Sequence, residues 1–445
     1  MDTESVRMRL RLAPFSTVPG GIHRVLDWAP GRREATIEFG TGFFTGWSPT
    51  PAGADLLRFA TAVFCADRTT LRRSCPDGWT RSFHIEVPVA APDEWNLANW
   101  SRTLGFLTGD RWTIVPHRSR PASTESAGLP VDAVSLFSGG LDSLCGVIDL
   151  LEDDPQRRLL LIAHHEGGQA STAQRALFAA LTGIYGSRIL LRRMFCRPAP
   201  SDPTQAQPLP DLHERTTRSR SLLFIAGALA AASAVGAHVP VYVPENGWIG
   251  LNVPLTRART GSASTRTTHP HFIDLLAQTC RALGLDNPII NPYRLKTKGE
   301  MMLACRNRRL LTRLAPATIS CSHPETPRWR SRSQGNCGYC LPCLVRRAAL
   351  ARIRLDRAEH YAWDALTDTA LLDLTKRTGA DLRAVVHGVS PHRDELSIIR
   401  NAPLPAGEHQ EHLNLWRRGA AEIRAWLGDS ENELAQLTAT AWRSR

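Results

Sequence analysis

Lysine is almost absent from this chain of 445 residues. Only three of its 54 cationic residues are lysine, and all the others are arginine. No apolar run reaches the ~20 residues that a membrane-spanning helix requires. The longest run, Leu222 to Ala237, is rich in alanine and glycine, which predicts a buried helix. The first residues also lack the apolar core of a secretory signal. We therefore expect a cytoplasmic protein without membrane contact.

The overall composition excludes several classes of protein. Apolar residues make up 42% of the chain and charged residues 22%, which is near the globular average and excludes a mainly disordered, collagenous or coiled-coil protein. The net charge of +12 favours nucleotides, pyrophosphate, nucleic acid or an acidic partner, without choosing among them. Ten cysteines in a reducing compartment are more typical of buried thiols or metal ligands than of disulfides.

The pattern of secondary structure changes twice along the chain. Short β-like stretches around one helix, 52–65, predict a β-rich N-terminal domain over residues 1–128. A Pro/Ser-rich linker is predicted at 116–130. Strands and helices then alternate, which predicts a parallel sheet with helices on both faces over residues 129–350. Residues 351–445 predict a helical C-terminal region. The α/β strands are expected at 133–137, 159–163, 189–195, 239–243 and 289–293, and the helices at 141–152, 171–185, 219–236, 270–283 and 299–314.

A glycine-rich loop follows the first of these α/β strands. It consists of Ser138, Gly139, Gly140, Leu141, Asp142 and Ser143. The two glycines allow close approach of a ligand, and the helix that begins here offers unpaired N–H groups to an anion, so we expect phosphate to bind. The serine hydroxyls can add donors, and Asp142 can orient a magnesium ion or a loop N–H. A simple capped glycine turn is the alternative. The loop is neither a Walker loop nor a Gly-x-Gly-x-x-Gly fingerprint.

Four cysteines gather within 23 residues and predict a metal centre. They are Cys321, Cys337, Cys340 and Cys343. The last three form a Cys-x2-Cys-x2-Cys cluster, and Cys321 can complete a tetrahedral shell of four thiolates. Four thiolates leave no open position, which is typical of structural zinc. Buried free thiols and an iron–sulfur cluster are the alternatives.

Two of the three lysines lie together in the segment Leu-Lys-Thr-Lys-Gly-Glu, after a predicted strand and at the start of a helix. An ammonium group at the carboxyl edge of a parallel sheet can contact phosphate oxygens. We favour Lys298 over Lys296 for this role. The alternative is a pair of solvated surface charges.

These motifs follow one another in a characteristic order between about residues 131 and 350. The loop is followed by Gly-Gln after the second strand, by Arg-x3-Phe at the start of an Ala-rich helix, by Thr-Lys-Gly-Glu and by Cys-Gly-Tyr-Cys-Leu-Pro-Cys. This order resembles the QueC family, the 7-cyano-7-deazaguanine synthases, which are PP-loop ATP pyrophosphatases. The resemblance implies a HUP-like fold, similar to the adenine nucleotide alpha hydrolases, with ATP, Mg²⁺ and Zn²⁺ as cofactors.

The resemblance also implies roles for particular residues. ATP binding is carried over to the six loop residues and to Gly168 and Gln169, zinc binding to the four cysteines, and catalytic roles to Asp142, Lys298 and Arg220. The implied reaction is the adenylation of a carboxylate, 7-carboxy-7-deazaguanine, with release of pyrophosphate. The acyl group then passes to an amine, which is ammonia or, by our hypothesis, an amine on a partner protein.

The chain departs from the family pattern at several points. Gly167 stands where the family has tyrosine, Ser221 stands where asparagine is expected, and the segment 243–260 differs throughout, so the pocket for the deazapurine is altered. The additional regions at both ends resemble the QatC component of the Qat anti-phage defence system. That layout implies protein partners in a defence complex.

Two other functions are compatible with the same residues. The chain can be a non-catalytic subunit that binds a nucleotide or nucleic acid, with the arginines at 306–313 and 328–332 contacting phosphates. It can also be a PP-loop enzyme that modifies tRNA. Sulfur relay suits the chain poorly, because its one multi-cysteine cluster is expected to bind metal.

Overall fold

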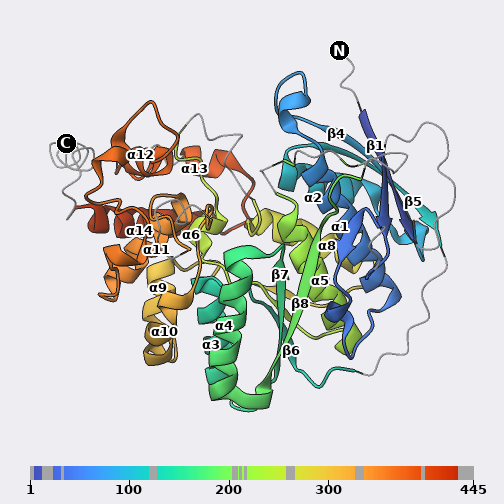
Figure 1. Cartoon of the computed structure of the whole chain (residues 1–445), viewed down its shortest axis with the longest axis horizontal. Coiled ribbons are helices and arrows are strands. Elements are labelled where there is room, and N and C mark those ends of the chain that lie inside the picture. Colours follow the sequence, from blue (N-terminus) through green and yellow to red (C-terminus); the bar gives the residue numbers. More distant parts are fainter. Residues whose placement is uncertain are drawn as a thin grey trace.

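The computed structural model describes most of the chain as an α/β protein (Figure 1). The described residues are 5–12, 24–31, 35–119, 128–202, 209, 213–214, 218–256, 266–325, 335–391 and 396–428. None of the helices in these ranges has both the length and the apolar character that would let it cross a membrane.

One sheet runs through the N-terminal and central parts of the molecule. Its strand order is β10-β9-β6-β7-β8-β3-β2-β1-β4-β5. All neighbouring strands are parallel except β3 and β8, which are antiparallel. The strands are β1 (Ser5–Leu12), β2 (Arg24–Trp28), β3 (Ile37–Phe39), β4 (Ser82–Val89), β5 (Arg111–Arg118), β6 (Ala133–Leu136), β7 (Leu159–His165), β8 (Ile189–Pro198), β9 (Val241–Tyr242) and β10 (Ile289–Ile290).

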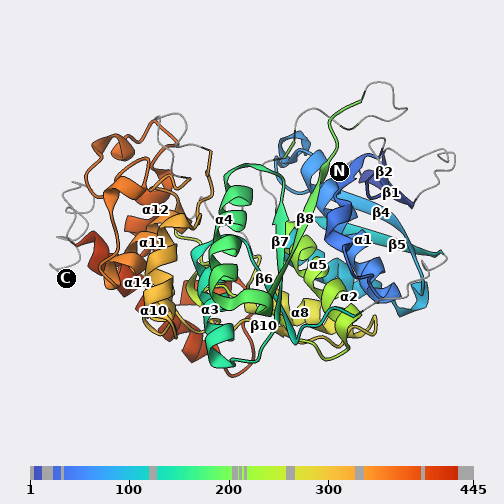
Figure 2. The same cartoon turned by 60° about the horizontal axis from the view of Figure 1, so that its bottom comes forward.

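Helices cover both faces of the central strands, which is why β6 and the first part of β7 are buried without alternation. In Figure 2, α3 (Leu141–Asp153) and α4 (Gly168–Tyr185) lie on one side of the sheet, and α5 (Arg220–Val235) lies on the other side with α1 (Pro51–Thr69). The mixed α/β class and the mostly parallel sheet that the sequence predicts are confirmed.

The N-terminal part contains the helix predicted at 52–65, which is α1, and a second helix that was not predicted, α2 (Leu97–Thr108), and both pack with its strands. The described N-terminal strands also do not form a separate sheet. Strand β3 pairs with β8, where Phe39 lies opposite Cys196, and α1 packs along α5. Buried residues from both sides of residue 129 belong to one hydrophobic cluster. The predicted linker overlaps β5 at one end, and its residues 120–127 lie outside the described part.

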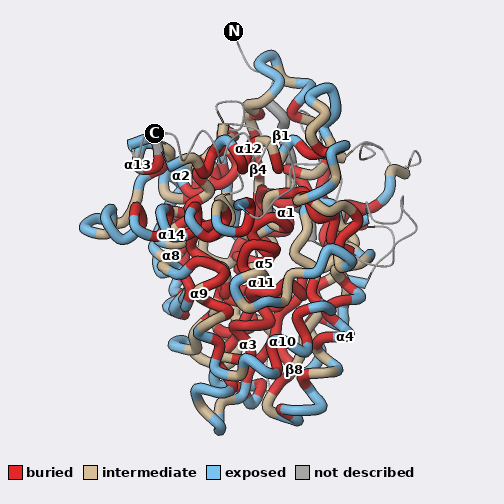
Figure 3. The backbone as a smooth tube through the Cα atoms, turned by 90° about the vertical axis from the view of Figure 1, so that its left-hand side faces the viewer, coloured by how far each residue is buried: buried red, intermediate tan, exposed pale blue. Residues whose placement is uncertain are grey.

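The C-terminal region is helical, as the sequence predicts. It follows α11 (Leu341–Arg352) and contains α12 (Ala380–Gly388), α13 (Leu396–Asn401) and α14 (His409–Leu427), with short 3-10 turns at 358–360 and 369–372. These helices share a hydrophobic cluster with α11, three of the four clustered cysteines and Trp248, which stacks on Trp416. Figure 3 shows the buried backbone concentrated in the interior, around α5 and α11.

The predicted elements of the α/β part are confirmed, with shifts of a few residues at their ends. The expected helix at 299–314 is two helices, α9 (Lys298–Leu303) and α10 (Arg308–Leu314). The expected helix at 270–283 is α8 (Pro270–Arg281), which precedes β10, and one short helix that the sequence analysis did not predict, α6 (Gly247–Gly250), follows β9.

Candidate functional site

The glycine-rich loop connects the carboxyl end of β6 to the first turn of α3. Gly139 has a left-handed backbone, with φ at +81°, and Gly140 is the N-cap residue of the helix. The loop is braced from within: the Ser138 hydroxyl accepts a hydrogen bond from the Gly140 N–H (3.3 Å), and the Ser143 hydroxyl donates to the Gly140 carbonyl (3.0 Å). This geometry directs the start of a helix, with its positive dipole end, to the edge of the sheet where ligands bind in this architecture.

Gly139→Ala tests the importance of the loop conformation. A Cβ atom at this position would lie 3.2 Å from Gln174, in a backbone region that L-residues rarely adopt. We expect a loss of about 1–2 kcal/mol in unfolding free energy and a loss of ATP affinity, measured by calorimetry. Gly407→Ala is the matched control, because its φ is +82° and nothing lies near its Cβ position. Equal ATP affinity in the two variants would contradict a role for the loop in binding.

Asp142 and Lys298 form a buried ion pair beside the loop. They are 6% and 3% exposed, and the Lys298 ammonium donates to Asp142 Oδ1. Lys298 is the first residue of α9, whose N-terminus is fixed by a capping box between Thr297 and Glu300. Lys296, in contrast, is exposed and lies over the ring of Tyr293. The structure therefore places Lys298, and not Lys296, beside the glycine-rich loop.

The second oxygen of Asp142 is held by Asn246. Its Oδ2 accepts hydrogen bonds from the Asn246 backbone N–H (3.0 Å) and from the side-chain amide (2.8 Å). Burial opposes the charge of Asp142, but Lys298 and these hydrogen bonds outweigh it and lower the pKa of Asp142. Asp142 is thus an ionised carboxylate that aligns Lys298, and it does not bond a loop N–H.

Glu245 is a second carboxyl group at this place. It follows β9, and its Oε1 accepts from the same Asn246 amide at 3.4 Å. Burial, together with the nearby charge of Asp142, raises the pKa of Glu245 well above its ordinary value of 4.5. Sequence reasoning missed Glu245 and Asn246 as site residues, although polar residues directly after a parallel strand were a usable signal.

Glu245→Gln tests whether the pKa of Glu245 is raised in the folded protein. When the pKa of an acid is higher in the folded than in the unfolded state, the unfolding free energy falls progressively as the pH rises above the pKa of the unfolded state, here 4.5. Below that pH the two proteins should differ by a constant amount. Between about pH 5 and 8, the unfolding free energy of the parent protein should fall relative to that of Glu245→Gln, as measured by urea denaturation. Glu359→Gln makes the same change at an exposed position and is the control. A parallel curve for Glu245→Gln would refute the shift.

Arg220 is connected to the loop through two intermediate side chains. Its Nε donates to His164 Nδ1 (3.1 Å), and Gln174 Nε2 donates to both the His164 carbonyl (3.1 Å) and the Ser138 carbonyl (3.3 Å). Burial and the charge of Arg220 lower the pKa of His164 well below its ordinary value. His164 is thus neutral, with its remaining N–H on Nε2 directed to the Cys196 carbonyl (3.2 Å).

The N-terminal region helps to place Arg220. Asp67, at the end of α1, accepts hydrogen bonds from the backbone N–H (3.0 Å) and the hydroxyl (2.6 Å) of Ser219. Ser219 is the residue before Arg220 and the N-cap residue of α5. Asp67 also pairs with the buried Arg81. A residue expected to act in the site is therefore anchored by a part of the chain outside the central α/β unit.

Gly168 and Gln169 form the first turn of α4, next to the loop. The Ala170 carbonyl of this turn lies 3.4 Å from the position of a Cβ on Gly139. The Gln169 N–H donates to a carboxylate oxygen of Glu325 at 3.3 Å. An anion at the start of α4 would therefore have to displace Glu325, which is a contact that the sequence did not predict.

The four predicted metal ligands converge. All four sulfur atoms lie within 4.8 Å of one another. The sulfurs of Cys337 and Cys343 are 3.9 Å apart, and those of Cys340 and Cys321 are 3.8 Å apart. A tetrahedron with Zn–S bonds of about 2.3 Å has edges of about 3.8 Å, so the cluster has the size that zinc requires. Gly338, with φ at +93°, forms the turn, and a side chain there would collide with the Trp363 carbonyl. The cluster can therefore hold a metal ion.

Backbone N–H groups point at these sulfur atoms, as expected for thiolates. The Ser322 N–H donates to the Cys340 sulfur (3.4 Å), and the Cys337 N–H donates to the Cys321 sulfur (3.3 Å). The N–H groups of His323 and Cys340 donate to the sulfurs of Cys321 and Cys337.

A second group of possible metal ligands consists of Cys145, Asp149 and Cys305, whose ligand atoms also lie within 4.8 Å of one another. There, however, Asp149 already accepts from Tyr293 (2.6 Å) and the Arg306 N–H (2.8 Å).

The segment 318–320 joins the cysteine cluster to the glycine-rich loop. The Ile319 N–H donates to the Gly139 carbonyl (3.0 Å), and the Leu141 N–H donates to the Ser320 hydroxyl (3.2 Å). On its other side, the Ser320 carbonyl lies 3.7 Å from the Cys343 sulfur. Sequence reasoning treated the two motifs as separate sites, but the structure makes them neighbours.

Neither a protein-family model nor a curated protein sequence matches this chain. The exposed arginines at 306–313 lie on and before α10, away from the loop in sequence, and residues 328–332 lie outside the described residues.

Proposed function

We propose that this chain is a QueC-like PP-loop enzyme that uses ATP to adenylate a carboxylate and transfers the acyl group to an amine. The observation that carries the proposal is the buried Lys298–Asp142 pair beside the Ser138–Ser143 loop. A buried ion pair contributes little to stability, because removing water from its two charges costs free energy. A functional role of the ammonium group explains most simply why the pair is buried. The proposed carboxylate is 7-carboxy-7-deazaguanine, and the proposed setting is an anti-phage defence complex.

The residues of the site would divide the work as follows. The loop N–H groups and the start of α3 bind the β- and γ-phosphates of the nucleotide, which leave as pyrophosphate. Lys298, aligned by Asp142, stabilises the negative charge that develops on the departing oxygen. Arg220 adds a second positive charge from the opposite side of β7. The carboxylate substrate attacks the α-phosphorus, and an amine then displaces AMP from the acyl-adenylate.

Two metals would support this chemistry. The carboxyl groups of Asp142 and Glu245, which share the Asn246 amide, offer oxygen ligands of the type that magnesium prefers. The ion would displace the proton that the raised pKa of Glu245 favours, and it would neutralise phosphate charge. Zinc in the cysteine cluster would have no open position and would therefore be structural. It would hold in place the segment 318–320, which is hydrogen-bonded to the loop.

Pyrophosphate release tests the proposal directly. The protein is incubated with ATP and 7-carboxy-7-deazaguanine, and pyrophosphate, AMP and acyl-adenylate are quantified. We expect pyrophosphate in an amount equal to the sum of AMP and acyl-adenylate, and only when the carboxylate is present. ADP formation, or salt-sensitive DNA or RNA binding without AMP, would refute the ligase and favour a nucleotide- or nucleic-acid-binding subunit.

The acceptor amine needs a separate experiment. We propose a protein amine, because the N-terminal and C-terminal regions add surface around the site that ammonia would not need. The intact mass of a protein that co-purifies with this chain should rise by the mass of one deazaguanine acyl group after incubation with ATP and the acid. Free nitrile or amide formed from ammonia alone, at the same rate without that protein, would refute this acceptor.

A further inference from the structure

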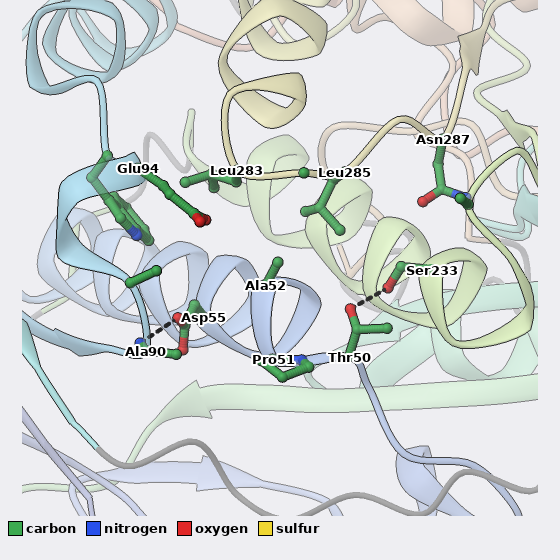
Figure 4. Close-up of a pocket in the computed structure, with 14 residues that line it drawn as sticks. Thr50, Pro51, Ala52, Asp55, Ala90, Glu94, Ser233, Leu283, Leu285 and Asn287 are labelled. Atoms are coloured by element: carbon green, nitrogen blue, oxygen red, sulfur yellow. Dashed lines mark hydrogen bonds between the residues drawn. The ribbon is translucent and has the colours of Figure 1, made fainter.

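A cavity lies at the opposite edge of the sheet from the glycine-rich loop. Its volume is about 370 Å³. Its walls come from the start of α1, the turn after β4, the end of α5 and the segment between α8 and β10 (Figure 4). The last two of these precede β9 and β10, whereas the loop follows β6, and all three strands are parallel. The cavity is therefore separate from the candidate nucleotide site.

The charged side chains that line this cavity are both acidic. They are Asp55 and Glu94, and no lysine, arginine or histidine belongs to the lining, although the chain carries a net charge of +12. Glu94 makes no ion pair within the described residues, and Figure 4 shows its carboxylate directed into the cavity. Asp55 is 3% exposed and accepts from the Ala90 N–H at 2.7 Å. Burial raises the pKa of Asp55 despite its pairing with Arg58, and the charge of Glu94 adds to this effect.

The two hydroxyl groups of the lining, on Thr50 and Ser233, can accept further hydrogen bonds but cannot donate any. Ser233 donates to the Ala230 carbonyl at 3.0 Å, so the hydrogen bond of 3.0 Å between Ser233 and Thr50 takes its proton from Thr50. Both hydroxyl protons are then used. The lone pairs that remain can only receive a donor.

Asn287 also presents an acceptor on this side. Its amide N–H groups donate to the carbonyls of Gly236 (2.8 Å) and Val239 (2.9 Å), which fixes the orientation of the side chain. Asn287 is 5% exposed, and its Oδ1 has no partner in the described part of the chain. Figure 4 shows this oxygen turned towards Leu285 and the cavity. A buried acceptor without a donor is unfavourable, so this wall favours a ligand that brings donors.

The remaining walls are apolar, with Ala52, Leu283, Leu285 and the indole of Trp95, which stacks on Trp100. We propose that this cavity binds a small aliphatic primary amine in its ammonium form. The ammonium group pairs with Glu94, since Asp55 already has Arg58 as its counter-ion, and the carbon chain packs on the leucines. Aromatic and acidic walls together are suited to organic cations.

Calorimetric titration of the full chain with n-butylammonium, 1-butanol and butyrate tests this site. The three probes share one carbon skeleton and differ in charge. We expect butylammonium to bind at least about tenfold more tightly than butanol, because a hydrogen bond to a charged group is stronger than one to a neutral group, and we expect no binding of butyrate. Equal binding of butylammonium and butanol, or preference for butyrate, would overturn the proposal.

Two variants locate the charge that matters. Glu94→Gln should reduce the preference for butylammonium to about twofold or less. Asp93→Asn is the matched control, because it removes the same charge one residue away, where Asp93 pairs with Arg118 (2.9 Å) outside the lining. Ala237→Leu, at an exposed position of the lining, should block all binding by filling the cavity. Equal losses in Glu94→Gln and Asp93→Asn would show a general charge effect and refute the site. Pyrophosphate release should not change in any of these variants.

Discussion

Lys298→Met is expected to lower carboxylate-dependent pyrophosphate release by about 10²- to 10³-fold, the usual effect of removing one group that stabilises developing charge. Lys298 is one of three lysines in the chain, and the one that lies buried against Asp142 beside the glycine-rich loop. Methionine keeps the length and apolar body of the side chain but removes its charge. Steady-state release of pyrophosphate measures the effect.

Lys296→Met is the matched control for this experiment. It makes the same substitution two residues away, at an exposed position, and its activity should stay within about twofold of the parent protein, because exposed substitutions have small effects. Equal losses in the two variants would refute the assignment of Lys298.

Loss of stability is the alternative explanation for a low activity in Lys298→Met. Removing one partner of a buried pair can destabilise a protein by about 3–5 kcal/mol. The double variant Asp142→Asn with Lys298→Met leaves no buried charge unpaired, so it should recover most of the melting temperature. Its activity should remain low. Recovery of activity together with stability would mean that the pair is structural only.

Cys340→Ser is expected to remove the bound metal and to unfold the region around it. Structural zinc sites supply about 10–16 kcal/mol of apparent folding free energy, which exceeds the stability of most domains. Elemental analysis should find about one zinc ion per chain in the parent protein and almost none in the variant. A brown colour in the parent protein would indicate an iron–sulfur cluster instead.

The same change should also abolish ATP binding, because the segment 318–320 connects the cysteines to the loop. Cys280→Ser is the control, since Cys280 is equally buried but lies on α8, away from the cluster. It should retain both metal and ATP affinity. Normal ATP binding in a Cys340→Ser protein that has lost its metal would show that the loop does not depend on the metal centre.

The sequence by itself determined the features that depend on neighbouring residues. The loop at 138–143, the capped start of α9 at Lys298 and the spacing of the cysteines are local patterns, because a helix N-terminus or a tight turn is specified within a few positions. The alternation of strands and helices also predicted the parallel sheet, since apolar runs of strand length between helices have few other ways to be buried.

Only the tertiary structure decided which distant residues meet. Glu245 and Asn246 are about a hundred positions from Asp142, and they reach it because β9 pairs with β6. Ser320 belongs to no strand and comes to the loop through the hydrogen bonds that the segment 319–320 makes with Gly139 and Leu141. The fusion of the N-terminal strands with the central sheet depends on three residues of β3 pairing with β8. Which strands pair over long distances depends on how the whole core is buried, and this cannot be read from the sequence of a single segment.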